Sequence, residues 1–170
     1  MGFNYSKTQK TTKKLLTKFG QTGEVRAYLQ SGFDPVEGTN TIEYVQTYPK
    51  MLSVPSVSTG FKYFDQGFLN GLVTGQTKIF LVDPLTLDFV PGSGMSVLFE
   101  GKLWDIGTED INTGVMPLSP LGGLPLLYTL GARLSGKDPT AGSVIPLVDA
   151  PAGEVVPIVG GVVTPQTGIY

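Results

Sequence analysis

The stretch from Met95 to Leu134 constrains the fold most, because apolar residues alternate with other residues over short segments that turn-forming residues separate. Apolar side chains recur at every second position on both sides of Glu100-Gly101, which predicts two strands joined by a tight turn. The residues expected on the buried faces of these strands and of the closing strand are Val97, Phe99, Trp104, Ile106, Leu126, Tyr128, Leu130 and Ala132. No catalytic cluster occurs in this stretch, so it predicts a structural framework.

Turn-forming residues are spread over the rest of the chain as well. The 170 residues include 23 Gly and 13 Pro interleaved with Val, Leu, Phe and Tyr, which indicates many short strands. Further strands are expected at residues 24–33, 41–45, 48–57 and 77–82. Asp34-Pro35 begins the turn between the first two, and Asp83-Pro84 ends the last. Pro49 and Pro55 interrupt the third, which predicts an edge strand or an irregular one.

The predicted fold is therefore mainly β, a small antiparallel β-barrel or sandwich with one N-terminal α-helix, a long central loop and an extended C-terminal arm. The chain length suits one domain with additional tails. The expected division is a basic helix at residues 1–22, a β-barrel domain at 23–134 and an arm rich in Pro, Val and Gly at 135–170.

The N-terminal segment is basic and has helical periodicity. All five of its lysines precede the first acidic residue, Glu24, whereas seven basic and fourteen acidic residues occur from Glu24 onward. These lysines are Lys7, Lys10, Lys13, Lys14 and Lys18. Asn4 or Ser6 can cap the helix, Gly20 can end it, and the end carrying Leu15 and Phe19 is expected to pack on another element. The lysines fit a solvated helix face or a protein contact better than a DNA contact, because the remaining chain is acidic.

Residues 58–76 form a Gly-rich aromatic segment. The residues singled out in it are Phe61, Tyr63, Phe64, Phe68, Leu69 and Asn70. Such a segment could stack on nucleic acid or sugar, but a nucleic-acid platform usually includes several basic groups, and only Lys62 and Lys78 are near. A long loop whose aromatic side chains pack on the core or on a neighbouring subunit is the favoured interpretation.

The chain after Arg133 changes in character, because five prolines separate short apolar clusters between Lys137 and Tyr170. This proline density predicts an extended conformation, and the segment is too apolar for an ordinary disordered tail. The residues expected to contact a neighbouring subunit are Val144, Ile145, Leu147, Val155, Val156, Ile158 and Val159. The alternative is a hairpin that folds back onto its own domain. If the arm docks on a neighbour, deletion of residues 139–170 leaves the barrel folded.

Several chemistries are excluded by composition. The chain has no Cys and no His, so disulfides, thiolate zinc sites, Cys nucleophiles and Ser-His-Asp triads are impossible. The acidic group formed by Asp105, Glu109, Asp110 and Asn112 lacks the spacing of a calcium loop and indicates a solvated turn. We therefore expect no enzyme activity, no cofactor and no metal. No apolar run is long enough to span a membrane.

Several short motifs together resemble the head-closure or head–tail stopper proteins of the tailed-bacteriophage neck. They are Lys18-Phe19-Gly20-Gln21, the strand Glu24 to Leu29, the turn Asp34 to Gly38, Gly101-x-x-Trp104-x-Ile106, Met116-Pro117-Leu118-Ser119-Pro120-Leu121-Gly122 and Leu127-Tyr128-x-Leu130. The resemblance covers about residues 3–134. The chain departs from the family in its aromatic central segment and in the residues that follow Leu134.

The resemblance implies a structural virion protein. It would form a hexameric or dodecameric ring that joins the portal and adaptor to the tail terminator or tail tube, continues the DNA channel and retains the genome until ejection. It would contact the packaged DNA without reading its sequence. The lysine-bearing helix is expected to contact the adaptor, and the aromatic loop the channel or an adjacent subunit. A tail-terminator ring and a carbohydrate- or receptor-binding β-sandwich are the alternatives.

Overall fold

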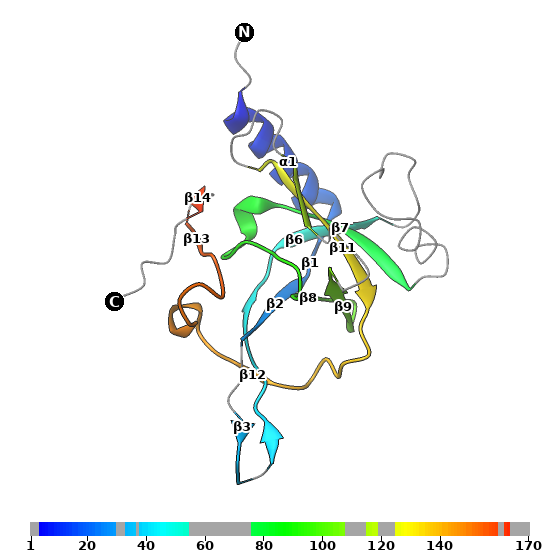
Figure 1. The fold of residues 1–170 in the computed structure, drawn as a ribbon. Helices are drawn as coiled ribbons and strands as arrows, with labels where there is room; N and C mark the ends of the chain where they lie inside the picture. The colour runs from blue at the N-terminus through cyan, green and yellow to red at the C-terminus, as the bar shows by residue number, and fades with distance from the viewer. Residues whose placement is uncertain are drawn as a thin grey trace.

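The computed structural model describes residues 4–29, 33–36, 38–54, 76–107, 115–118, 125–159 and 162–163. One N-terminal helix precedes a mainly β body, which confirms the predicted fold class (Figure 1). In these ranges no helix has the length and apolar character needed to cross a membrane.

The helix is α1 (Tyr5–Phe19). The main sheet contains β1 (Gln21–Thr22), β2 (Glu24–Leu29), β5 (Glu43–Thr47), β6 (Lys50–Val54), β7 (Thr77–Val82), β8 (Ser96–Phe99), β9 (Lys102–Ile106), β10 (Val115–Leu118), β11 (Leu127–Leu134) and β12 (Ser143–Val144). Two small hairpins pair β3 (Phe33–Asp34) with β4 (Thr39–Asn40) and β13 (Ile158–Val159) with β14 (Val162–Val163). Short 3₁₀ turns are η1 (Pro84–Thr86) and η2 (Leu147–Asp149).

The pairings of the main sheet run around a ring. The strand order is β1-β6-β7-β11-β9-β8-β2-β5-β12, and β10 extends the β9 edge along β11. The register that pairs Leu29 with Glu43 continues to the pair Gln21 and Met51, so β1–β2 and β5–β6 are two long, bent strands. Since β6 pairs with β7 and β2 pairs with β8, the sheet curls back onto its starting strands as a barrel does.

The bend in these two strands lies at Gly23 and Pro49. The Gly23 amide donates to the Pro49 carbonyl over 3.1 Å, which continues the ladder across the bend. A Cβ at Gly23 would overlap the Met51 side chain, so glycine permits the close approach. The segment around Pro49 was predicted to be an edge strand or an irregular one. β6 pairs with β7 from Met51 to Val54 and with β1 only at Lys50 and Met51, and the irregularity at Pro49 is the bend; Pro55 lies outside the described residues.

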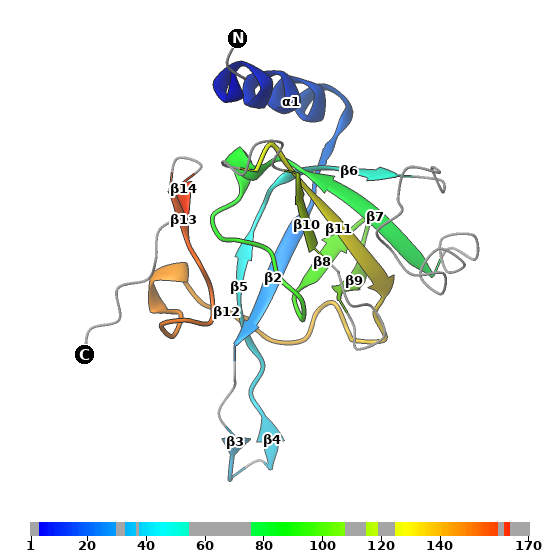
Figure 2. The same cartoon turned by 45° about the horizontal axis from the view of Figure 1, so that its top comes forward.

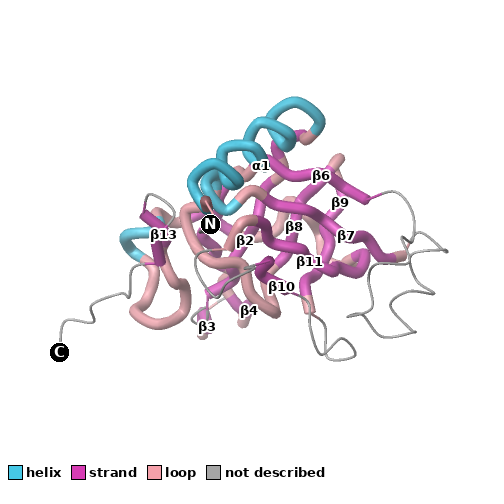
Figure 3. Tube along the Cα trace, turned by 90° about the horizontal axis from the view of Figure 1, so that it is seen from above, coloured by secondary structure: helices cyan, strands magenta, loops and turns pink. Residues whose placement is uncertain are grey.

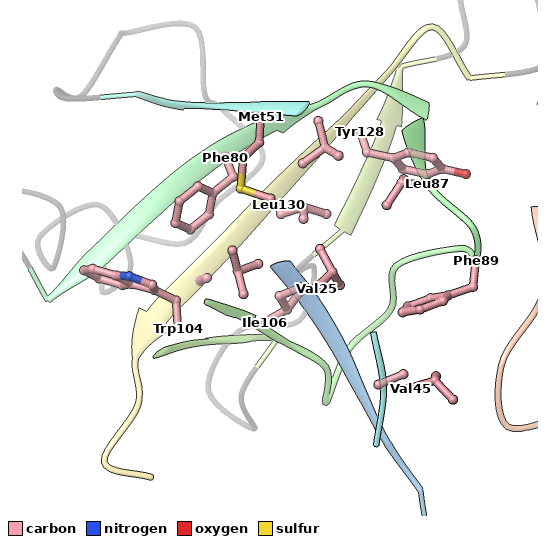
Figure 4. Close-up of a cluster of buried hydrophobic side chains, with 14 of the residues drawn as sticks. Val25, Val45, Met51, Phe80, Leu87, Phe89, Trp104, Ile106, Tyr128 and Leu130 are labelled. Atoms are coloured by element: carbon pink, nitrogen blue, oxygen red, sulfur yellow. The ribbon is translucent and has the colours of Figure 1, made fainter. Parts of the chain in front are cut away.

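The interior of the barrel is filled with apolar side chains (Figure 4). All eight residues expected on buried faces between Val97 and Ala132 are buried, which confirms the alternation. Phe80 packs edge-on against Phe99 and Trp104, with ring centroids 5.3 and 6.3 Å apart. Glu100 and Gly101 both have positive φ angles, 51° and 74°, as a tight hairpin turn between right-twisted strands requires.

Candidate functional site

The basic helix lies over the start of β6 at one end of the barrel, which we call the helix end (Figure 2). The Asn4 side chain caps it by accepting from the Lys7 amide over 3.0 Å, and the Gly20 amide closes it on the Leu16 carbonyl. Leu16 is buried, whereas Leu15 and Phe19 are 53% and 60% exposed. The end of the helix that carries Leu15 and Phe19 therefore packs on the barrel as expected, but through Leu16 and not through these two side chains.

The five lysines singled out in the sequence are all exposed on α1. The structure thus brings them together, exposed, on one element at the helix end. A shallow groove of about 370 Å³ runs along this face, and it is lined by Lys10, Lys13, Lys14, Thr17 and Lys18. The five lysines, with no acidic residue in α1, give this end of the molecule a positive potential that favours an acidic partner.

A buried carboxylate lies at the same end, where β7 leaves the barrel. Asp83 is 1% exposed, and its Oδ1 atom accepts from the Leu85 amide over 3.0 Å. Its Oδ2 atom has no hydrogen-bond partner in the described part of the chain. Burial raises the pKa of Asp83, and the Leu85 amide and the positive charge of Lys13 offset part of this rise. Lys13 on the helix therefore offsets a small part of the cost of burying this carboxylate.

The opposite end of β7 is the loop end of the barrel, where the chain leaves β6 and enters β7. Val54 pairs with Ile79 there, so both stems of the central segment are anchored on neighbouring strands. The predicted contact residues of that segment, Phe61, Tyr63, Phe64, Phe68, Leu69 and Asn70, lie outside the described residues.

Side chains close the barrel interior at the loop end. The Lys78 ammonium lies 4.9 Å from the centre of the Trp104 ring and 5.5 Å from that of Phe99. It also lies 3.6 Å from the Glu100 carboxylate. Trp104 itself is 2% exposed. The interior of one barrel is consequently a packed core with no room for a DNA strand.

The C-terminal arm begins with a buried arginine contact. Arg26 lies on the outer face of β2 and donates to the Pro139 carbonyl over 2.7 Å and to Glu24 over 2.6 Å. The Tyr44 ring stacks under its guanidinium at 4.6 Å. Together these contacts hold the start of the arm against β2 and β5.

A second contact fixes the same part of the arm. The Asp105 carboxylate accepts from Ser96 over 2.5 Å, from Ser135 over 2.8 Å and from Lys137 over 3.3 Å. Lys137 also lies over the Tyr28 ring at 5.0 Å. The prediction of a solvated turn is therefore wrong for Asp105, which belongs to β9; Glu109, Asp110 and Asn112 lie outside the described residues.

The rest of the described arm packs on its own barrel. β12 adds to β5 as a parallel strand, and the Ile145 amide donates to the Tyr44 carbonyl over 3.0 Å. Farther on, the Val90 amide donates to the Val156 carbonyl over 2.8 Å. Val155 is 1% exposed and belongs to the hydrophobic core. The arm thus folds back onto its own domain, as the alternative interpretation expected.

The predicted arm contacts divide into buried and exposed residues. Val155 is in the core and is not available to a neighbour, while Ile145, Leu147 and Ile158 pack partly against that core. The exposed ones are Val144 and Val156, together with Val148, which the sequence interpretation did not single out. The side chain of Val159 lies outside the described residues. A contact with another subunit stays a prediction for the exposed residues.

The described residues offer no group of three or more acidic side chains placed to bind a metal ion. The important contacts that the sequence interpretation missed are those of Arg26, Asp83 and Lys137. A charged residue within the apolar strand Glu24–Leu29 was the available signal for Arg26. The contact of Lys137 with Asp105 and the effect of Lys13 on Asp83 depend on neighbours far along the chain.

The chain was also compared with known proteins. No protein-family model matches it, and no curated protein is significantly similar to it in sequence.

Proposed function

We propose that this chain is a structural protein of the neck of a tailed bacteriophage, of the head-closure or stopper type. Copies of it assemble as a ring in the virion between the portal–adaptor complex and the tail. The ring continues the DNA channel and retains the packaged genome until ejection. The proposal rests on the sequence resemblance together with the arrangement of surfaces on the barrel.

The observation that carries the proposal is the contrast between a closed interior and open outer surfaces. Phe80, Phe99 and Trp104 fill the barrel, so a single chain offers no passage. A channel for DNA must then be bounded by several copies, each contributing the outside of its barrel. A rigid scaffold with protruding segments suits this role, because it holds contact surfaces at fixed positions.

The charge distribution supports the same role. The lysine face of α1 lies at one end of the barrel and suits an acidic surface of the adaptor. From Glu24 onward the chain carries twice as many acidic as basic residues, so the body attracts phosphates weakly. DNA can slide past such a surface, whereas a lysine-lined channel would hold its phosphates.

The decisive experiment removes the protein from a phage that encodes it and examines the particles. A stopper is required to keep DNA in the head, so its loss gives tails of normal length and heads that lose their genome. Complementation with the wild-type chain restores filled heads, and a labelled copy maps to the head–tail junction by electron microscopy.

The same experiment separates the alternatives. Tails of irregular length beside stable filled heads would assign the chain to a tail terminator. Infectious particles that lack only binding to host glycans would assign it to a receptor-binding protein. Either result contradicts the stopper proposal.

A further inference from the structure

Among the described surfaces that expose apolar side chains, two differ in charge. The first, the helix flank, consists of Leu15, Lys18 and Phe19 on α1. The Lys18 ammonium lies 5.2 Å from the centre of the Phe19 ring, so these exposed groups form one patch. The second, the arm lobe, is residues 144–156, in which Val148 is 88% exposed and Val144 and Val156 are 48% and 40% exposed.

The two surfaces have opposite charge. The α1 sequence contains five lysines and no acid, whereas residues 144–156 contain Asp149 and Glu154 and no basic residue. Opposite potentials beside exposed apolar groups favour contact between two such surfaces and disfavour contact of either surface with itself.

The surfaces cannot cover each other within one molecule. α1 lies over the helix end of the barrel, while the arm lobe lies beside the sheet, next to β5 and the connection that follows β7 (Figures 1 and 3). A contact between them must therefore join two copies. Because the surfaces differ, the contact is of the head-to-tail kind, which repeats around a ring when the rotation closes.

We infer that the helix flank of one copy docks on the arm lobe of a second copy. Leu15 and Phe19 then pack against Val148 and Val156, and Lys18 lies close to Asp149. Lys10 lies about two and a half helical turns before Phe19 on α1 and stays open to the adaptor. This inference rests on the proposed ring and names the surfaces that join its subunits.

The absence of cysteine from the natural chain makes a direct test possible. The full-length single variants Phe19→Cys and Val148→Cys are purified, mixed and oxidised. The inference predicts that the disulfide-linked dimer of one variant with the other exceeds either self-dimer by at least about fivefold. Lys10→Cys, about two and a half helical turns before Phe19, replaces Phe19→Cys in the control and gives no such excess with Val148→Cys. Random proportions of the three dimers would overturn the inference.

A charge exchange tests the same contact without a covalent link. Lys18→Glu and Asp149→Lys are each expected to weaken self-association by about tenfold in sedimentation velocity, and the double variant to recover most of the loss. Lys10→Glu is the matched control and changes association less than threefold. Both positions are exposed, and thermal melts check that each variant is folded. Additive losses in the double variant would contradict the inference.

The results also distinguish this inference from the proposed function. If rings assemble in the neck and their assembly is unchanged by these substitutions, the helix–lobe contact is overturned and the stopper role is not. Self-association through this contact in a protein that is not found at the head–tail junction would do the reverse.

Discussion

The N-terminal helix and the C-terminal arm both extend the barrel, but they are attached to it in different ways. α1 contributes Leu16 as its buried apolar side chain and leaves Leu15 and Phe19 in solvent. The arm adds a strand to β5, meets the buried Arg26 and places Val155 in the core. The sequence predicted regular structure for the helix and, because of its prolines, an extended arm that contacts a neighbouring subunit. Regular local structure is therefore a poor guide to how firmly a segment belongs to the domain.

Truncation should give the largest difference in stability between loss of the arm and loss of the helix. Deletion of residues 139–170 removes Val155 from the core and exposes Phe89, so we expect the free energy of unfolding to fall on the order of 4 kcal/mol. This reverses the expectation that the arm can be removed without loss of the barrel. Urea denaturation followed by Trp104 fluorescence measures the effect. Deletion of residues 1–19 is the matched control and should cost about half as much or less; equal losses would contradict the comparison.

Removal of the buried arginine should loosen the arm while α1 stays in place. Arg26→Met leaves Glu24 without its buried partner and the Pro139 carbonyl without its donor, and should destabilise by about 3 kcal/mol. Hydrogen exchange should accelerate at the amides of Ser143 and Ile145. These amides donate to the carbonyls of Ile42, just before β5, and of Tyr44 in β5. Unchanged exchange at these two amides would show that Arg26 does not hold the arm.

Among the described side chains of α1, Leu16 should contribute most to the contact with the barrel. Leu16→Ala removes the buried apolar group of α1, and we expect a loss of about 2 kcal/mol. Leu15→Ala, one position away and exposed, should change the stability of the monomer by less than about 0.5 kcal/mol. Thermal or urea denaturation at low protein concentration measures both. A larger effect at Leu15 would place the wrong face of the helix against the barrel.

The smallest expected effect is a pH dependence at the helix end. The pKa of folded Asp83 is raised by burial, so its contribution to stability is full below the unfolded pKa and is lost as pH rises through the folded value. Asp83→Asn keeps an acceptor for the Leu85 amide and removes this titration. The free energy of unfolding of the variant minus that of wild type should therefore increase as the pH rises from 3 to 7, measured by urea denaturation. A constant difference across this range would show that Asp83 titrates normally.

The sequence predicted the parts of the fold that depend on neighbouring residues. β7 has the predicted bounds because alternation begins at Thr77 and Pro84 ends it. The turn at Glu100-Gly101 is likewise local. Leu16, rather than Leu15, is the buried leucine because adjacent apolar residues on a helix point about 100° apart, and only the position of the barrel decides between them.

Contacts between distant residues could not be predicted in the same way. Ring closure depends on the pairing of β2 with β8, and the arm depends on the bond between Arg26 and Pro139. Asp105 looked like a loop acid because its partners Ser135 and Lys137 lie about thirty residues later. The aromatic segment has no structural counterpart among the described residues, so its role stays a prediction.

The unbroken register of the first long hairpin has a consequence for synthesis of the protein. β1–β2 and β5–β6 can pair as soon as they leave the ribosome, since their partners are close in sequence. The barrel cannot close until β11 has emerged, and Val155 must follow before the core is complete. Until then the nascent hairpin exposes both an apolar face and unpaired edges. Nearly the whole chain must therefore be made before this protein is protected from aggregation.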